Sequence, residues 1–459
     1  MTRRPTHHGF TLLELSFALT AGLIVAMGIV ALSREATRTF HEEVRSAAAE
    51  ATLRTAIDRL RADIQRAGFM STGNIAADPL LVGKPAGQTT PPGVLDCGTY
   101  NAICNLTAIH VTDQGFGGNT ALPLSGVQVP SLNPAWIDIA GNMTSVEQFA
   151  VQAVLPVTNG AQCQTILLSQ TSATYARIVA SVYSQNQQAD TASELQHIFA
   201  PYSGAQFIVR VVDDTGHSQY LATCPGTPTS NAAAGFLNGQ PFVQVDSRTP
   251  VQTARETGNV GGVSGFGSGR AWVNPVQIVR WQIMAATAEQ PMYQAGLGAM
   301  AFGGTDPTKY DLVRSYLGMD GNPIAATQEV VAEYAVDLDF AFSFEAGTPL
   351  QPNTLTYGFE DKVHRQNSVE WASTPGQGLP AGIIPQRLRA VRVRLATRVA
   401  LPDRTVNIVP NNAGEFIYRY CVNPNGCTNL TDANLPQWAR TRTITADVSL
   451  PNLATAFYP

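Results

Sequence analysis

A single carboxylate lies inside a long apolar segment near the N-terminus. Between residues 10 and 32, Glu14 is the only residue with an ionisable side chain. A carboxylate in hydrocarbon costs about 2.5 to 3.5 kcal/mol on insertion scales, so it requires a cationic partner. The start of a helix also favours an acid, because four unpaired N–H groups form the positive end of the helix dipole. The sequence therefore predicts that Glu14 forms an ion pair.

The apolar segment is long enough to cross a bilayer as a helix. Arg3 and Arg4 precede it, and the positive-inside rule places them in the cytoplasm, with the residues after Leu32 on the other side of the membrane. The alternative is a secretory signal peptide, whose apolar core of about 7 to 15 residues ends at a cleavage site of small residues. The longer run and the acid within it favour the membrane helix.

The segment from Gly9 to Leu15, with the sequence GFTLLEL, resembles the processing site of type IV prepilins. In that family a membrane peptidase cuts after the glycine and methylates the new terminal amine. The resemblance implies that Gly9 is the cleavage residue and that Phe10 becomes the methylated N-terminus. It also implies that Glu14 pairs with the terminal amine of a neighbouring subunit during assembly. Cleavage would remove two of the 29 basic side chains, against 34 acidic ones, so the mature chain is expected to be acidic.

The same helix is expected to continue beyond the apolar segment. No proline occurs from Phe10 until Pro79, so one helix over about residues 10–67 is predicted, with Gly68 as its C-terminal cap. Four apolar side chains recur at spacings of four and three residues, which places them on one face that packs against a sheet. They are Leu53, Ile57, Leu60 and Ile64. A free coiled coil is the weaker alternative, because the heptad pattern is short.

The rest of the chain shows the two-residue period of strands. Apolar and polar side chains alternate over residues 333–344, 391–399 and 444–450. The predicted fold class is α+β: a pilin-like fold in which one long N-terminal helix packs on an antiparallel β-sheet, with an enlarged β-rich insertion. Shorter candidate strands are residues 165–168, 206–212 and 276–283.

Three further stretches, residues 61–69, 388–395 and 442–452, resemble minor pilins of the PilW kind. The chain is longer than that group implies, which places an enlarged region between Phe69 and about Trp272. The membrane half of the helix lacks the proline that major pilins often carry, and this favours a minor subunit.

Five parts are expected along the chain. Residues 225–270 are rich in Gly, Ser, Thr, Asn and Pro, and a long surface loop is predicted there. The parts are a leader peptide (1–9), a transmembrane or filament-core half of the helix (10–32), an amphipathic half (33–68), an enlarged β-rich and loop-rich region (69–271) and a C-terminal antiparallel sheet region (272–459).

Six cysteines follow the membrane segment, where an oxidising compartment would pair them. Sequence alone does not select among the pairings. Our prediction joins two pairs of near neighbours in the chain, which leaves the other two cysteines to pair with each other. The spacing of a zinc site is absent from the sequence, so no metal is expected. The predicted pairs are Cys97 with Cys104, Cys163 with Cys224, and Cys421 with Cys427.

The sequence contains no HExxH, P-loop or GxSxG motif, which predicts a non-enzymatic protein with no catalytic residue and no cofactor. Calcium stays open as an alternative. Acidic loops at Asp213-Asp214 and at Asp320-Gly321-Asn322 offer suitable oxygen ligands, although turn chemistry alone explains both.

Charge argues against broad binding to nucleic acid. Charged residues make up 14% of the chain and the formal net charge is -5.

The densest basic cluster is interpreted as a solvated sheet face, with DNA contact as the alternative. A switch of the apolar register between Arg389 and Val391 also predicts a β-bulge. The arginines of the cluster are Arg387, Arg389, Arg392, Arg394 and Arg398.

The resemblance implies a minor pilin, a structural subunit that helps to initiate a type IV pilus and lies at or near its tip. Its expected partners are the prepilin peptidase, other minor and major pilins, and a pilus-tip adhesin, whereas DNA is not expected. Before assembly it would lie in the inner membrane with a periplasmic body, and afterwards in the extracellular pilus. The alternatives are a pseudopilin of a type II secretion system and a pilus-borne adhesin or receptor-binding module. The sequence does not distinguish among twitching motility, cell adhesion and DNA uptake as the role of this subunit.

Overall fold

Two units make up the part of the chain that the computed structural model describes. Residues up to Ala51 form one unit, and residues from Thr52 onward form the other. Helix α1, Leu12–Gln65, contributes residues to both. The described residues are 11–75, 78, 80–82, 97–112, 134–157, 162–182, 187–202, 204–224, 233–252, 263–264, 270–285, 309–345, 355–356, 388–402, 419–422 and 438–454.

The described part of the first unit is helical, and it is apolar up to Leu32. Large apolar side chains such as Leu12, Phe17 and Ile24 are exposed along it. The most apolar window of α1 has a mean hydropathy of 2.3, and none of that window is buried. Of the helices in the described residues, α1 is the one long and apolar enough to cross a membrane. This observation is consistent with the predicted single-pass anchor.

The C-terminal end of α1, at Gln65, lies in the second unit. Gly68, the predicted capping residue, lies three residues beyond it and donates to a residue outside the helix. Gly68 has a φ of 72°, a left-handed conformation that glycine adopts without a steric penalty. Its N–H donates to the carbonyl oxygen of Ala140 at 2.9 Å. A Cβ at this position would lie 2.8 Å from Leu453 Cδ2, so a larger residue would clash as well as strain the backbone.

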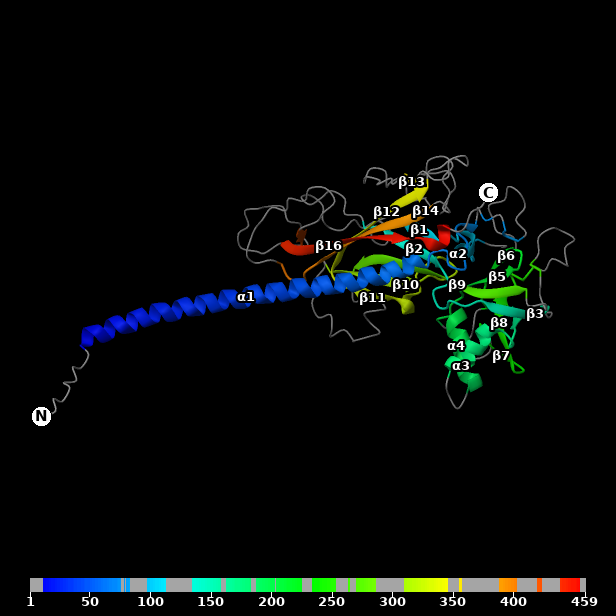
Figure 1. Ribbon diagram of the computed structural model, residues 1–459, viewed down its shortest axis with the longest axis horizontal. Coiled ribbons are helices and arrows are strands. Elements are labelled where there is room, and N and C mark those ends of the chain that lie inside the picture. Colours follow the sequence, from blue (N-terminus) through cyan, green and yellow to red (C-terminus); the bar gives the residue numbers. More distant parts are fainter. Residues whose placement is uncertain are drawn as a thin grey trace. The chain divides into compact units, whose positions relative to one another are not determined.

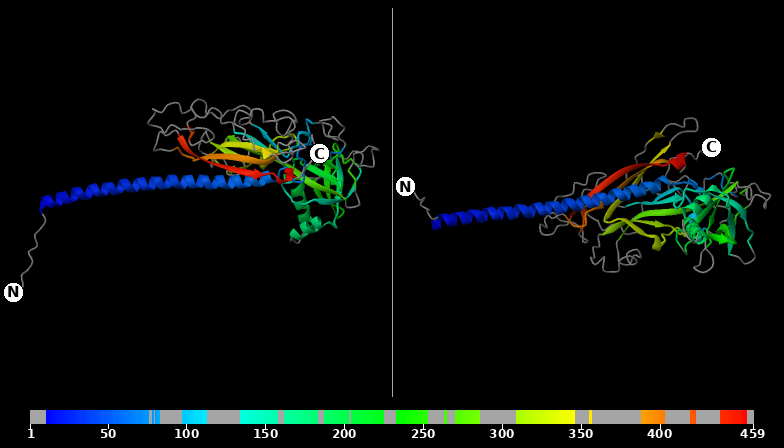
Figure 2. Two further views of the ribbon diagram at one scale, coloured as in Figure 1. Left: turned by 45° about the horizontal axis from the view of Figure 1, so that its top comes forward. Right: turned by 60° about the horizontal axis from the view of Figure 1, so that its bottom comes forward.

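The apolar stripe at the end of α1 is buried between two sheets. The exposed fractions of Leu53, Ile57, Leu60 and Ile64 are 0%, 4%, 0% and 0%. These residues share one hydrophobic cluster with strands of both sheets. Figure 2 shows this end of the helix between orange-red strands and green-yellow strands. At about 1.5 to 3 kcal/mol for each buried side chain, the stripe contributes on the order of 6 to 12 kcal/mol before the entropy loss.

The smaller sheet has five strands in the order β13-β12-β14-β16-β15, and all of its pairs are antiparallel. It contains the three strands that the alternating pattern predicts. Ser343 pairs with Ala390 but Phe344 pairs with Leu388, so Arg389 forms the predicted β-bulge. The strands are β12 (Ala335–Glu345), β13 (Leu355–Thr356), β14 (Leu388–Arg398), β15 (Arg419–Cys421) and β16 (Trp438–Ser449).

The larger sheet has eleven strands, with β9 near its centre. Strand β9 pairs antiparallel with β2, β3, β5 and β10. The predicted regions 69–271 and 272–459 therefore share one sheet. The strands are β1 (Ile109–Thr112), β2 (Trp136–Gly141), β3 (Phe149–Val154), β4 (Cys163–Leu168), β5 (Ile208–Asp213), β6 (Ser218–Ala222), β7 (Ala234–Leu237), β8 (Gln240–Asp246), β9 (Ala271–Ala285), β10 (Tyr310–Tyr316) and β11 (Glu329–Ala332).

Two helices that were not predicted from the sequence, α3 and α4, lie next to each other, with α4 beside β7 and α3 beside β3 (Figure 1). Leu195 and Phe199 of α4 belong to a second hydrophobic cluster with Val243 of β8. The side chain of Ser172 accepts a hydrogen bond from Tyr175 N and caps α3, a signal that the sequence contains. The helices of the second unit are α2 (Asn101–Cys104), α3 (Ala173–Ser181), α4 (Gln187–Phe199), the 3-10 helix η2 (Ala325–Thr327) and α7 (Pro451–Ala454).

The prediction of a long surface loop over residues 225–270 is wrong for residues 234–246, and residues 225–232, 253–262 and 265–269 of that range lie outside the described residues. This range contains β7 and β8, which pair as an antiparallel hairpin. The turn residues Asn238 and Gly239 have φ values of 50° and 79°. Positive φ at both central residues is the requirement of a type I′ turn, and Asn-Gly is its strongest sequence signal. The glycine-rich composition around the hairpin outweighed that signal.

A polar contact fixes the end of α1 on the larger sheet. Asp63 Oδ2 accepts hydrogen bonds from Trp281 Nε1 at 2.9 Å and from Arg314 Nε at 2.8 Å. The side chains of Asp63 and Arg314 are only 13% and 12% exposed. The neighbouring pair of Arg59 and Glu329 is 40% and 48% exposed. Exposed pairs contribute little, whereas a buried charge without its partner is costly, so Asp63 is the stronger constraint.

The substitution Asp63→Ala is expected to lower the free energy of unfolding by about 3 to 5 kcal/mol, because Arg314 would stay buried without its carboxylate. The matched change Arg59→Ala is expected to lower it by less than about 1 kcal/mol. Thermal denaturation of the full chain in detergent would compare the two variants. Equal losses would contradict the importance assigned to Asp63.

Candidate functional site

The side chain of Glu14 is hydrogen-bonded to the start of its own helix, α1. Thr11 directly precedes the helix, and Glu14 N donates to Thr11 Oγ1 at 3.3 Å. In return, Glu14 Oε2 accepts from the Thr11 N–H at 3.0 Å and from the Thr11 hydroxyl at 2.9 Å. This reciprocal arrangement is a capping box. The sequence analysis predicted an acid at the helix start but missed Thr11, although its Thr-x-x-Glu spacing is the usual signal.

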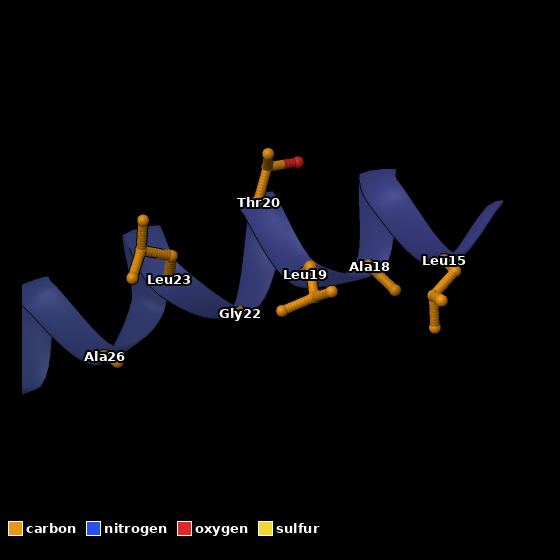
Figure 3. A pocket seen from close by; sticks show the side chains of 7 residues that line it. All are labelled: Leu15, Ala18, Leu19, Thr20, Gly22, Leu23 and Ala26. Carbon is orange, nitrogen blue, oxygen red and sulfur yellow. The ribbon is translucent and has the colours of Figure 1, made fainter. Parts of the chain in front are cut away.

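A groove of small residues continues from Glu14 along α1. Ala18, Gly22 and Ala26 recur every four residues, so they share one face of the helix, and Ala18 is four residues from Glu14. Figure 3 shows these three on one side of the ribbon; Thr20, which points to the other side in this view, also lines the groove. Small residues allow the backbone of a second helix to approach closely in a membrane. The groove is also lined by Leu15, Leu19 and Leu23.

Gly9 and Phe10, the predicted cleavage and methylation residues, lie outside the described residues. In the sequence, Phe10 directly precedes Thr11. A chain that began at Phe10 would therefore have its terminal amine one residue before the capping box. Their roles stay predictions.

Two disulfides lie within the described residues. Cys97 and Cys104 enclose α2, with Cα atoms 5.8 Å apart, and Cys163 and Cys224 join β4 to the end of β6, with Cα atoms 5.7 Å apart. They are two of the three predicted pairs. The third involves Cys427, which the structure does not describe. Disulfides persist in oxidising compartments, in agreement with a body on the far side of a membrane.

Two arginines of the predicted basic cluster are buried. Arg394 Nε donates to Asp337 Oδ2 at 2.8 Å, and its Nη2 lies 2.7 Å from Asp339 Oδ2. Arg394 is 7% exposed and Arg398 is 1% exposed. The interpretation of the cluster as a solvated face is therefore wrong for both residues. Their burial also removes them from direct contact with DNA.

The other arginines of the cluster have separate roles. Arg392 Nε donates to Asp447 Oδ1 at 2.6 Å, and this hydrogen bond lowers the pKa of Asp447. Arg389 Nη1 donates to the carbonyl oxygen of Leu388 at 3.1 Å. Arg387 lies outside the described residues.

Hydrogen bonds occupy Asp213 and Asp320 in the two candidate calcium loops, and Asp214 lies 3.7 Å from Arg270 Nη1 in an ion pair. Asp213 Oδ1 accepts from Thr215 N at 3.0 Å and Oδ2 from Ser264 N at 3.1 Å. Burial alone would raise the pKa of Asp213, but hydrogen bonds from these residues hold it below its usual value. Asp320 accepts from the backbone and side-chain nitrogens of Asn322 at 3.0 and 2.8 Å. Over the described ranges, no three His, Cys, Asp or Glu side chains gather as a metal site.

Neither a family model, nor a curated protein, nor a solved structure matches this chain in the comparisons with known proteins. The assignment of a function therefore rests on the residues themselves. Among them, Glu14 and the groove that follows it have the most specific chemistry.

Proposed function

We propose that this chain is a minor pilin, a structural and non-enzymatic subunit that helps to initiate a type IV pilus and lies at or near its tip. The observation that carries the proposal is the position of Glu14. It is an acid in the first turn of a helix that is apolar and long enough to cross a membrane. An acid there requires a cationic partner once hydrocarbon or packed helices surround it.

The proposed partner is the terminal amine of a neighbouring subunit. In the single chain, the hydrogen bonds from Thr11 to the Glu14 carboxylate both end on Oε2, at 2.9 and 3.0 Å. The capping box would therefore hold the carboxylate in place while Oε1 remains accessible to an amine. Attraction between opposite charges is stronger in low-dielectric surroundings than in water, so this contact would form best inside a bundle of like helices.

The groove of Ala18, Gly22 and Ala26 supports the same proposal. It continues from Glu14 at the same spacing, so a second helix packed along it would pass close to the carboxylate. When the apolar segment moves from the membrane into a filament, packing against a second helix would then cover its apolar surface. The same contact would give the Glu14 carboxylate its cationic partner.

Two changes at Glu14 test the ion pair. Glu14→Gln retains a side chain that can cap the helix but removes the charge, whereas Glu14→Ala removes both. Each variant is expected to be cleaved normally but to fall more than about tenfold in sheared filaments, because the partner amine loses more than about 1.4 kcal/mol of interaction. Leader cleavage and filament content would be measured by immunoblot. Glu35→Gln, an exposed position of α1 beyond the apolar segment, is the control. Normal filament content of Glu14→Gln would contradict the proposal.

The groove is tested by comparing two glycines of α1. Gly22 lines the groove, while Gly28 lies about 240° around the helix from it. Gly22→Ile is expected to reduce co-purification with sheared filaments, because the added side chain prevents close approach of a second helix. Gly28→Ile adds an equally apolar side chain, but on another face of the helix. It should therefore have the smaller effect. A larger loss for Gly28→Ile would show that another face of α1 packs in the filament.

A further inference from the structure

A polar cleft in the second unit is separate from the helix start that carries the proposed function. The residues that line it belong to α2 and the segment just after it, strands β1, β2 and β9, and the loop 317–322 that follows β10. Its volume is about 510 Å³. Small-molecule sites usually occupy about 300 to 1,000 Å³. The cleft is therefore large enough to be a binding site.

Three charged or titratable side chains form one wall of the cleft. Asp138 is paired directly with His110 of β1 and Arg280 of β9, so the three residues lie abreast across neighbouring strands. Arg280 donates to Asp138 through Nε at 2.6 Å and Nη2 at 2.8 Å. His110 Nδ1 lies 3.5 Å from Asp138 Oδ2. Arg280 is also stacked on Trp136, with its Cζ 5.1 Å from the ring centroid.

The carboxyl group in this wall is held in one protonation state. Burial alone would raise the pKa of Asp138, but hydrogen bonds from Arg280 and His110 hold it below its usual value, so the carboxylate is ionised at neutral pH. A buried ion pair contributes little net stability compared with apolar packing. Its position at the side of a cleft therefore calls for an explanation other than stability, and a preorganised binding surface is such an explanation.

Amide groups form another part of the lining. Asn105 Nδ2 donates to Asn101 Oδ1, and Asn322 Nδ2 donates to Asp320 Oδ2. These bonds orient the side chains and leave Asn101 Nδ2 as a donor and the side-chain oxygens of Asn105 and Asn322 as acceptors, with no bond to them within the described residues. The cleft therefore offers both a donor and acceptors to a ligand.

The backbone beneath the amides is also fixed. The Cys97–Cys104 disulfide encloses α2, which carries Asn101. The N–H of Ala102 donates to the carbonyl oxygen of Met319 at 2.9 Å, which joins α2 to the 317–322 loop. Gly321 has a φ of 80°, and a Cβ there would lie 3.8 Å from Asn101 Cγ. The cleft is thus built on a rigid frame and would lose little entropy on binding.

The groups in the cleft favour a neutral ligand rich in hydroxyl groups. Asp138 and Arg280 neutralise each other, and an anion would be repelled by Asp320. A metal ion would find Asp320 already bonded to Asn322. Hydroxyl groups both donate and accept, as the amides do, and the apolar side chains of Ile278 and Leu317 can contact C–H groups between them.

We propose that this cleft binds a neutral carbohydrate, with the side chains of Asn101, Asn105 and Asn322 hydrogen-bonded to its hydroxyl groups and the Asp138–Arg280 pair as a fixed wall. This inference goes beyond the proposed pilus function and does not depend on it. A protein that is not a pilus subunit could still bind a sugar here.

Saturation-transfer NMR on the full chain tests the proposal. The probes are glucose, galactose, mannose, N-acetylglucosamine and N-acetylgalactosamine, each added separately. The detergent must be a phosphocholine rather than an alkyl glycoside, since a sugar headgroup would compete for the cleft. At least one of the five sugars is expected to receive magnetisation from the protein.

The double variant Asn105→Ala with Asn322→Ala removes two exposed amides of the cleft. It is expected to weaken binding of that sugar by about tenfold or more, because each lost hydrogen bond contributes about 1 kcal/mol. Gln188→Ala, an exposed amide on α4, is the matched control and should bind as the unchanged chain does. Near-ultraviolet circular dichroism would verify that the variants fold. Absence of transfer to all five sugars, or transfer that the double variant leaves unchanged, would overturn the proposal.

Discussion

Helix α1 presents two different surfaces along one continuous backbone, and the described structure depends on this change. Up to Leu32 it is apolar on every side, apart from a few small polar residues and the single acid Glu14. From Leu53 to Ile64 it instead buries a narrow stripe, while charged residues such as Arg61 occupy the other faces. A uniformly apolar surface suits hydrocarbon, and a narrow stripe suits a protein core. Both sheets of the second unit pack on that stripe.

Strand β9 joins the parts of the second unit. Its residues Val273, Val276 and Val279 belong to three different hydrophobic clusters. Within the described ranges, the enlarged middle region therefore shares its hydrophobic clusters with strand β9. The same strand carries Trp281, which binds Asp63 of α1, and Arg280, which forms a wall of the polar cleft. Strand β9 thus holds the end of the helix in place and also forms a rigid wall of the cleft.

Much of the fold could be predicted where one local pattern decided it. The period of Leu53 to Ile64, the missing proline and Gly68 defined α1, and strict alternation identified β12, β14 and β16. The α3–α4 pair and the β7–β8 hairpin were missed, because their signals are single turn or capping residues in polar surroundings. Glu14 could be identified because its cost in hydrocarbon is large. The cleft could not be, because pairing of distant strands brings Asp138 beside Arg280, and Asn101 reaches the same cleft from helix α2.

The central claim is that Glu14 acts together with a terminal amine created by cleavage after Gly9. Mass spectrometry of the intact protein and its N-terminal peptide tests this claim most directly, in membrane and sheared-filament fractions of the wild type and of a strain without the prepilin peptidase. The account predicts a chain that begins at Phe10 with one methyl group, present at low abundance in sheared filaments and absent without the peptidase. An uncleaved chain, or a chain cut at another residue, would contradict it.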